Sequence, residues 1–201
     1  MKIGLILGSF DPIHIAHINL ASCVLNANLC DKVLFVVAKQ NPWKNNEPTP
    51  FNLRCEMISA SLRPFQDKCE VCALEEEIEP PTYSYKVLDL IREKHLNDEL
   101  YLIVGSDTLE GLHLWRKYEE KIKPFFKVIS VERDSLLTKT NDDKPFLIND
   151  KDDNLKGIAP LTMIISSTII RNMVSQGMNP YPYVTQETLE IINKFNLYKN
   201  R

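Results

Sequence analysis

The residues whose types and spacing could do chemistry begin at Gly8, directly after the apolar run from Ile3 to Leu7. The stretch reads Gly-Ser-Phe-Asp-Pro-Ile-His-Ile-Ala-His and leads into a helical pattern. A helix N-terminus offers backbone N–H groups and a partial positive charge. His14 and His17 are three residues apart, so they share one helical face and can address the same anion. The stretch predicts a phosphate site that is neither a Gly-x-Gly-x-x-Gly fingerprint nor a Gly-Lys-Ser/Thr loop.

A second phosphate signal opens a later helix, where Ser166, Ser167 and Thr168 are followed by Arg171. A hydroxyl residue before an apolar helical run is first of all an N-cap. A cap explains one hydroxyl, but it does not explain three in a row with an arginine at the next turn. Hydroxyls and a guanidinium at a helix start can hold a polyphosphate. Together, the two segments predict a two-sided clamp for a triphosphate.

The segments Gly8–His17 and Ile165–Arg171 resemble the nucleotidyltransferase superfamily, whose first motif carries two histidines at a helix start and whose second reads Ser-Ser/Thr-x-x-Arg. Further signals narrow the resemblance to bacterial-type nicotinate mononucleotide adenylyltransferases, over nearly the whole chain. They are Asn41-Pro42-Trp43-Lys44, Gly105-Ser106-Asp107-Thr108-Leu109, Trp115 and Arg133. The chain departs from that family at Lys86, where an aspartate is common.

This resemblance implies an enzyme of NAD biosynthesis. Its reaction transfers the adenylyl group of ATP to nicotinate mononucleotide, and also to nicotinamide mononucleotide, giving deamido-NAD or NAD and pyrophosphate. The attacking 5′-phosphate is already an anion, so the protein must position two polyanions and neutralise charge, with no covalent intermediate. Mg²⁺ is expected to be held through the ATP phosphates, with no metal ligands from the protein.

The resemblance also implies roles for individual residues. The expected catalytic residues are His14, His17, Lys44 and Arg171. The expected ATP-binding residues are Gly8, Ser9, Phe10, His14, His17, Gly105, Asp107, Ile165, Ser166, Ser167, Thr168 and Arg171. The expected residues of the mononucleotide site are Lys44, Arg54, Ser84, Trp115 and Arg133.

Several of these residues have an ordinary structural alternative. Asp107 resembles the family's acceptor for ribose hydroxyls, and it would equally suit a helix N-cap. Trp115 resembles the aromatic residue that stacks on the pyridine ring, and between Leu112 and Leu114 it would equally suit a core. Isolated arginines such as Arg54 and Arg133 more often form surface ion pairs.

Two other functions compete. A phosphopantetheine adenylyltransferase shares both phosphate motifs, but that family is usually shorter and lacks the Gly-Ser-Asp-Thr-Leu segment followed by tryptophan. A catalytically silent nucleotide sensor should have lost His14, His17 or Arg171, and this chain has all three. A cytidylyltransferase or a class I aminoacyl-tRNA synthetase remnant fits less well, because the chain has no Lys-Met-Ser-Lys-Ser-like loop and no basic character.

The elements that must position these residues are strands that alternate with amphipathic helical patterns. This alternation predicts an α/β fold, a Rossmann-like doubly wound parallel sheet with helices on both faces. Predicted strands are Lys2–Leu7, Lys32–Ala38, Glu70–Leu74, Leu100–Gly105, Lys127–Glu132 and Ile158–Ile164. Predicted helices are Ile15–Leu29, Asn52–Leu62, Ser84–His95, Leu112–Ile122, Ser167–Gln176 and Thr185–Phe195. In such sheets ligands bind beyond the carboxyl ends of the strands, where His14, Lys44, Asp107 and Arg133 are expected.

Length and charge bound the remaining possibilities. The 201 residues predict one nucleotidyltransferase domain, with residues 138–156 as an exposed polar loop or insertion. A net charge of −3 argues against nucleic-acid partners, and no apolar run is long enough for a membrane. The expected partners are therefore small-molecule substrates, in a cytoplasmic protein, with a homo-oligomer left open. Cys69 and Cys72 have metal-like spacing, but without a second pair the five cysteines suggest reduced thiols.

Overall fold

A computed structural model describes residues 1–40, 47–131, 140–141, 144–148, 155–158 and 165–199. Its centre is one eight-stranded sheet in the order β3-β2-β1-β4-β5-β8-β7-β6. The strands are β1 (Lys2–Gly8), β2 (Lys32–Val37), β3 (Cys69–Cys72), β4 (Glu99–Gly105), β5 (Phe126–Val131), β6 (Thr140–Asn141), β7 (Lys144–Ile148) and β8 (Leu155–Ile158). In this order the neighbouring pairs β3–β2, β2–β1, β1–β4, β4–β5 and β5–β8 are parallel. The last two pairs, β8–β7 and β7–β6, are antiparallel. The predicted parallel sheet is confirmed.

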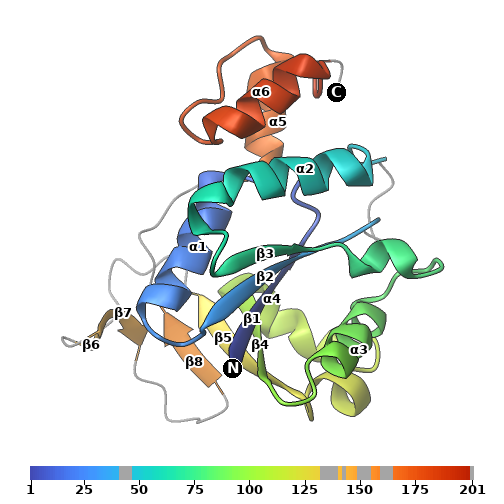
Figure 1. Cartoon of the computed structure of the whole chain (residues 1–201), viewed down its shortest axis with the longest axis vertical. Helices are drawn as coiled ribbons and strands as arrows, with labels where there is room; N and C mark the ends of the chain where they lie inside the picture. The colour runs from blue at the N-terminus through green and yellow to red at the C-terminus, as the bar shows by residue number, and fades with distance from the viewer. Residues whose placement is uncertain (41–46, 132–139, 142–143, 149–154, 159–164, 200–201) are drawn as a thin grey trace.

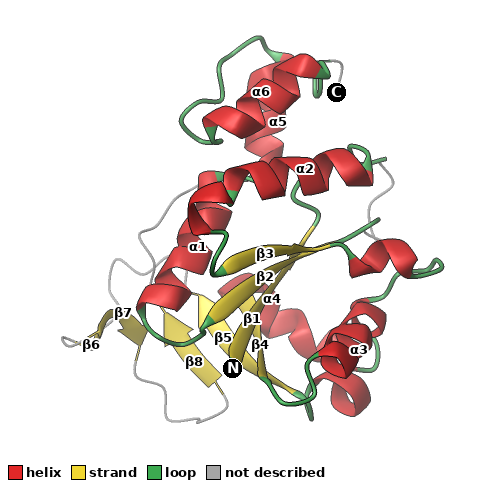
Figure 2. Ribbon diagram, in the orientation of Figure 1, coloured by secondary structure: helices red, strands yellow, loops and turns green. Residues whose placement is uncertain are grey.

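Helices cover both faces of this sheet, as Figure 1 shows for α1 and α2 on one side and α3 on the other. The α-helices are α1 (Ile15–Asn26), α2 (Phe51–Ser61), α3 (Ser84–Lys94), α4 (Ser106–Gly111), α5 (Ser167–Ser175) and α6 (Gln186–Lys194). Figure 2 shows α5 and α6 beyond α2, at one end of the molecule. The helices predicted at α1, α2, α3, α5 and α6 are confirmed to within a few residues.

Two hydrophobic cores follow from the two-residue period of the strands. Ile6 and Phe35 belong to the core under α1 and α2, whereas Leu5 and Leu34 belong to the core under α3. Cys69 and Cys72 illustrate the same rule, because their odd spacing sends the two thiols into different cores. Because this Cys-x-x-Cys segment is a strand, its two sulfurs lie on opposite faces of the sheet and cannot bind the same metal ion.

The order of the strands creates a switch point at β1. The chain builds β1, β2 and β3 outward in one direction, then returns to place β4 on the other side of β1. Connections from β1 and β4 therefore leave in opposite directions, and a crevice forms at their carboxyl ends. Gly8 and Gly105 are the last residues of these two strands. The fold brings the two glycine-containing segments to one edge.

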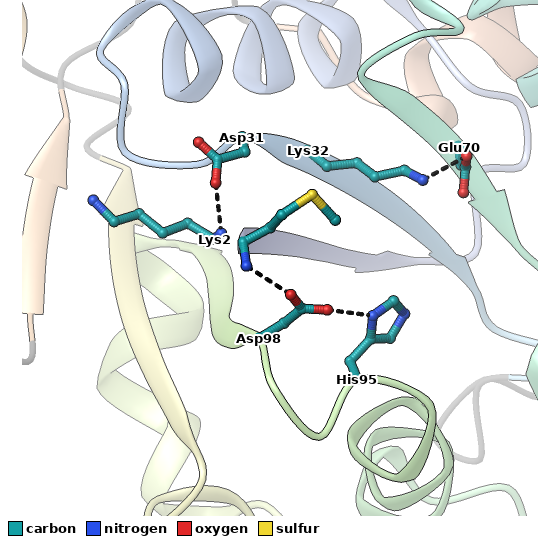
Figure 3. Close-up of polar contacts among 7 residues, drawn as sticks. Lys2, Asp31, Lys32, Glu70, His95 and Asp98 are labelled. Atoms are coloured by element: carbon teal, nitrogen blue, oxygen red, sulfur yellow. Dashed lines mark hydrogen bonds and ion pairs between the residues drawn. The ribbon is translucent and has the colours of Figure 1, made fainter.

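A group of polar and charged contacts lies at the opposite edge of the sheet, where the strands begin (Figure 3). The carboxylate of Asp98 lies 2.7 Å from the Met1 α-amino group and 2.9 Å from Nδ1 of His95. The backbone N–H of Lys2 donates to Asp31 at 2.7 Å. The contacts around Asp98 raise the pKa of the Met1 amine and lower the pKa of the carboxyl. These pairs join the starts of neighbouring strands, far from the crevice.

Two expectations about regular structure were wrong. Residues 112–122 do not form one α-helix: they form a 3₁₀ turn at Leu112–Leu114 and a π-helical turn at Tyr118–Ile122. Between them Trp115 is extended and Lys117 has a left-handed φ of 58°, so the helical hydrogen bonds cannot continue. Residues 138–156 are not simply a loop either, because β6, β7 and the start of β8 lie within them. In these residues, hydrogen bonding between neighbouring strands outweighs the polar composition that predicted a loop.

Candidate active site at the switch point

The loop after β1 places a buried aromatic ring beneath the predicted phosphate site. Phe10 has a left-handed φ of 47° and is 2% exposed. A Cβ added to Gly8 would stand 3.1 Å from this ring, so glycine allows the ring to fold back over the strand end. The ring meets the His17 imidazole edge-on at 5.0 Å. Its side chain supports the histidine from the core, and the expected role of Phe10 in ATP binding remains a prediction.

The two histidines form a stacked pair at the start of α1. Their ring centroids are 3.7 Å apart with an angle of 23° between the planes. The backbone N–H of His14 donates to Nδ1 of His17 at 3.3 Å. A neutral His17 that accepts at Nδ1 carries its proton on Nε2, which makes Nε2 a donor. His14 is 5% exposed and His17 is half-buried, so His17 is the more accessible of the two.

Helix α5 docks directly onto this loop. The hydroxyl of Ser167 donates to the carbonyl oxygen of Pro12 at 2.8 Å, and Nη1 of Arg171 donates to the carbonyl oxygen of Asp11 at 2.7 Å. Nη2 of Arg171 also bonds the hydroxyl of Thr168 at 3.1 Å. The structure thus joins the two predicted phosphate segments, although they are more than 150 residues apart in sequence.

Only one of the three hydroxyl residues at the start of α5 acts as its N-cap. Ser166 is the N-cap and accepts from the backbone N–H of Ile169 at 3.3 Å, while Ile165 precedes the cap as a half-buried residue. Ser167 and Thr168 make other contacts, so capping explains one hydroxyl of the three. The N–H groups of Ser167 and Thr168 belong to the first turn, where an α-helix supplies no internal acceptor. A ligand phosphate can use them.

The start of α1 offers fewer backbone donors than expected. The N–H of Ile15 donates to the carbonyl oxygen of Tyr183 at 2.9 Å, and the N–H of His17 donates to the carbonyl oxygen of His14 at 2.9 Å. The predicted binding of an anion at this helix would therefore depend more on the imidazoles than on the peptide groups. The bond to Tyr183 fastens the segment between α5 and α6 to the same loop.

Beyond β4, Gly105 is the N-cap of α4 and Asp107 lies in the first turn of that helix. Asp107 is therefore not the N-cap that was considered as an alternative. Its side chain lies outside the described part of the structure. Lys44 and Arg133 also lie outside the described residues, so their expected roles in the site remain predictions.

A cluster of aromatic and basic side chains surrounds the N-terminus of α3. The rings of Tyr83 and Tyr85 are nearly parallel, with centroids 6.2 Å apart. The guanidinium of Arg116 lies 4.5 Å from the Tyr83 centroid, and the ammonium of Lys117 lies 5.0 Å from that of Tyr85. Ser84, predicted to bind the mononucleotide, is the first residue of α3. The cluster concentrates positive charge near the N-terminus of α3, where Ser84 lies.

Trp115 adjoins this cluster in sequence and is half-buried against the core under α3. Its packed part is consistent with a residue of the core, and its accessible part is consistent with stacking on a ligand ring. The ammonium of Lys86, the departure from the family pattern, donates to the carbonyl oxygen of Glu79 at 3.2 Å. Lys86 is thus engaged with the segment that leads into α3.

Arg54 does not lie on the surface. Its side chain is 0% exposed and donates four hydrogen bonds of 2.6 to 2.9 Å to backbone carbonyl oxygens. The acceptors belong to Ser9, Ala38, Lys39 and Thr49. Burial lowers the pKa of this guanidinium, and the neighbouring Asp11 carboxylate opposes that effect. Arg54 was expected in the mononucleotide site, but this environment makes it a tie between the loops after β1 and β2.

A family model described as cytidylyltransferase-like matches residues 5–173. A Flavobacterium johnsoniae protein named probable nicotinate-nucleotide adenylyltransferase is 30% identical over 201 residues, which cover 99% of this chain and 100% of the relative. A Coprothermobacter proteolyticus protein of the same name is 31% identical and covers 98% of this chain and 95% of its own length. The chain belongs to the nicotinate-nucleotide adenylyltransferase family.

Solved structures support the fold assignment for this adenylyltransferase chain. Plasmodium falciparum nicotinic acid mononucleotide adenylyltransferase, complexed with NaAD, has a TM-score of 0.78 at 23% identity and covers all of this chain and 98% of its own. A putative nicotinate-nucleotide adenylyltransferase from Vibrio parahaemolyticus has a TM-score of 0.69 at 19% identity, with coverage of 100% and 98%. At these identities the likeness is one of fold, and it confirms the Rossmann-like nucleotidyltransferase type.

Sequence reasoning missed several residues that the structure places at this candidate site. Arg116 and Lys117 follow Trp115 directly, but an exposed basic pair gives no signal of what it stacks on. Asp11 lies inside the first motif and was treated only as part of the turn. Its contacts come from distant segments, which no local pattern could have indicated.

Proposed function

We propose that this chain catalyses attack of the 5′-phosphate of nicotinate mononucleotide on the α-phosphorus of ATP. A new P–O bond forms at the α-phosphorus, the bond to the β-phosphate bridge breaks, and pyrophosphate leaves. Deamido-NAD is the product. The observation that carries the proposal is the docking of Ser167 and Arg171 onto the loop that bears His14 and His17.

The proposed work of the site is positioning and charge neutralisation. Positioning of two reactants can supply ~7–11 kcal/mol of a barrier. His17, donating from Nε2, would bond the α-phosphate, with His14 stacked against it. Arg171 and the first turn of α5 would hold the β- and γ-phosphates. Preorganised donors of this kind stabilise the charge that develops as pyrophosphate leaves.

The mononucleotide would occupy the side of the crevice between β4 and α3. Trp115 supplies a ring for the pyridine, and Ser84 supplies a hydroxyl at a helix start. Arg116 and Lys117 add positive charge in the same region. In both mononucleotides the ring is a pyridinium, but only nicotinate also carries a carboxylate, which these cations would attract. The acid is therefore the preferred substrate in this proposal.

Magnesium would accompany ATP. Among the described residues, no group of three or more His, Cys, Asp or Glu side chains could hold a metal ion. The donors that face the crevice are imidazole, hydroxyl and guanidinium groups, which suit phosphate oxygens better than Mg²⁺. The ion would be bound through the ATP phosphates and supply further neutralisation there.

The other functions considered have less support. The curated relatives carry the nicotinate-nucleotide name over the whole length of the chain, which does not favour a phosphopantetheine enzyme. A silent sensor is not favoured either, since the two phosphate segments are intact and docked. Within the described ranges, no helix has both the length and the apolar character to cross a membrane. A cytoplasmic location remains a prediction.

The test is a substrate comparison with purified protein. Pyrophosphate release would be followed with ATP and, in turn, nicotinate mononucleotide, nicotinamide mononucleotide and phosphopantetheine, and products would be identified by mass spectrometry. We expect the highest kcat/KM with nicotinate mononucleotide and a product with the mass of deamido-NAD. A higher kcat/KM with phosphopantetheine, or no release with any acceptor, would overturn the proposal.

A further inference from the structure

One buried hydrogen bond ties the segment after α6 to the loop that carries the histidines. The phenol of Tyr198 donates to Oδ1 of Asp11 at 2.8 Å, across 187 residues of sequence. The two residues are 4% and 6% exposed, so the bond is made away from solvent. A buried bond to a charged carboxylate is a strong one, since water does not compete for it. It is not a surface contact that could be lost without effect.

The backbone around this tyrosine is strained. Tyr198 has a φ of 65°, in the left-handed region that bulky side chains rarely adopt. Asn196, two residues earlier, has a φ of 50°, which an asparagine after a helix end tolerates more easily. Strain of this kind persists only where surrounding contacts impose it. Here the imposed conformation delivers the phenol to Asp11.

Asp11 is the residue on which three segments converge. Its Oδ1 accepts from Tyr198, its Oδ2 accepts from the backbone N–H of Thr49 at 3.3 Å, and its carbonyl oxygen accepts from Arg171 at 2.7 Å. The carboxylate anchors the backbone of this residue to Thr49 and Tyr198. The carbonyl oxygen of that same backbone accepts from Arg171, so the anchor limits how far the acceptor for the guanidinium can shift.

We propose that Tyr198 and Asp11 are positioning residues, which act through Arg171 to hold the guanidinium in its place for the ATP phosphates. The inference rests on the proposed function for the identity of the reaction, but its effect on ATP binding can be measured without any acceptor. Neither residue needs to touch substrate. Loss of the phenol would remove one of the contacts that anchor Asp11 and so let the loop backbone, with the acceptor of Arg171, shift more easily.

The first test removes only the phenol, with Tyr198→Phe. We expect the variant to fold, to show about a three- to tenfold rise in KM for ATP, and to show an unchanged KM for the mononucleotide. The affinity for a non-hydrolysable ATP analogue, measured by calorimetry, should fall by the same factor. Tyr181→Phe is the matched control, because Tyr181 is 55% exposed and should change neither constant.

A double-mutant cycle separates positioning from general stabilisation. If Tyr198 acts through Arg171, Tyr198→Phe should have no further effect on ATP affinity in an Arg171→Ala background. Asp11→Asn, which keeps an acceptor oxygen for the phenol, should fall between wild type and Tyr198→Phe.

Three results would overturn the inference. They are unchanged ATP constants in Tyr198→Phe, equal rises in both KM values together with a lower melting temperature, and a full additive effect in the Arg171→Ala background. Failure of the proposed function would look different. The wild-type protein would then bind the ATP analogue without transferring an adenylyl group to nicotinate mononucleotide, and the calorimetric comparison would still test the positioning role.

Discussion

The hydroxyl of Ser167 donates a 2.8 Å hydrogen bond to the carbonyl oxygen of Pro12, and this contact turns two helix starts into one site. Together with the bond from Arg171 to the carbonyl oxygen of Asp11, it holds the start of α5 against the loop after β1. With it, His17 and Arg171 are fixed relative to each other before ATP arrives. Preorganisation of this kind removes a reorganisation cost from the reaction.

The role of His17 can be tested by His17→Ala. We expect turnover to fall by ~10²–10³, the scale for loss of one preorganised donor, while the fold stays intact. The measurement is kcat for pyrophosphate release, with circular dichroism to confirm folding. His113→Ala is a suitable control because His113 is exposed. Near-normal turnover in His17→Ala would rule out its assignment to the α-phosphate.

Trp115→Ala tests the stacking role. Mononucleotide binding should weaken by ~1–3 kcal/mol, the scale of base–aromatic stacking, with ATP binding little changed. Calorimetry with each ligand separately gives both affinities. Leu112→Ala serves as a packing control, because Leu112 is 2% exposed and its loss should lower stability without a selective effect. Equal losses of both ligands in Trp115→Ala would make the tryptophan structural.

The preference for acid over amide can be assigned to a side chain. Arg116→Gln should lower the ratio of kcat/KM for nicotinate mononucleotide to that for nicotinamide mononucleotide by roughly tenfold, or ~1.4 kcal/mol. The charge lost would otherwise attract the nicotinate carboxylate. Arg92→Gln is the matched control, since the guanidinium of Arg92 also lies over an aromatic ring, 4.0 Å from the Phe125 centroid, but Arg92 is in the last turn of α3, away from its N-terminus. An unchanged ratio would place carboxylate recognition on backbone groups.

How far the sequence could be interpreted depended on whether the signal was local. The spacing of His14 and His17 and the run of hydroxyls before Arg171 are local, and the predicted helix starts at both are confirmed. The strands β1 to β5 and their carboxyl ends were likewise predicted from short apolar runs, whereas β6 and β7 were not predicted and the strand expected at Ile158–Ile164 lies almost wholly outside the described residues. Contacts such as Tyr198 to Asp11 depend on tertiary packing, and no local pattern indicates them.

The wrong expectations have the same origin. The apolar spacing of residues 112–122 fits a helix, but an extended Trp115 and a left-handed Lys117 interrupt it. Arg54 looked like an isolated surface charge because the carbonyl groups that surround it come from three separate segments. Only the folded chain brings those carbonyls together. The burial of a charge is therefore the feature that single-sequence reasoning is least able to predict.

The thiols of Cys69 and Cys72 should be unreactive. Burial raises the pKa of Cys69 to about 11 and also raises the pKa of Cys72. Both therefore remain protonated at pH 8, and the thiolate is the form that reacts. We expect slow alkylation of the native protein at pH 8 and fast alkylation after unfolding, followed by mass spectrometry. Stoichiometric zinc in the purified protein would contradict this assignment.

Arg54→Ala should affect stability, not substrate affinity. The substitution leaves four carbonyl oxygens, one in a buried and three in part-buried hydrogen bonds, without their donor, at ~1–3 kcal/mol for each group that water cannot reach. The free energy of unfolding, from urea titration, should fall by at least ~3 kcal/mol. Arg54→Lys keeps the charge and some donors, so it should lose less. A variant of normal stability with a raised KM for the mononucleotide alone would instead return Arg54 to the substrate site.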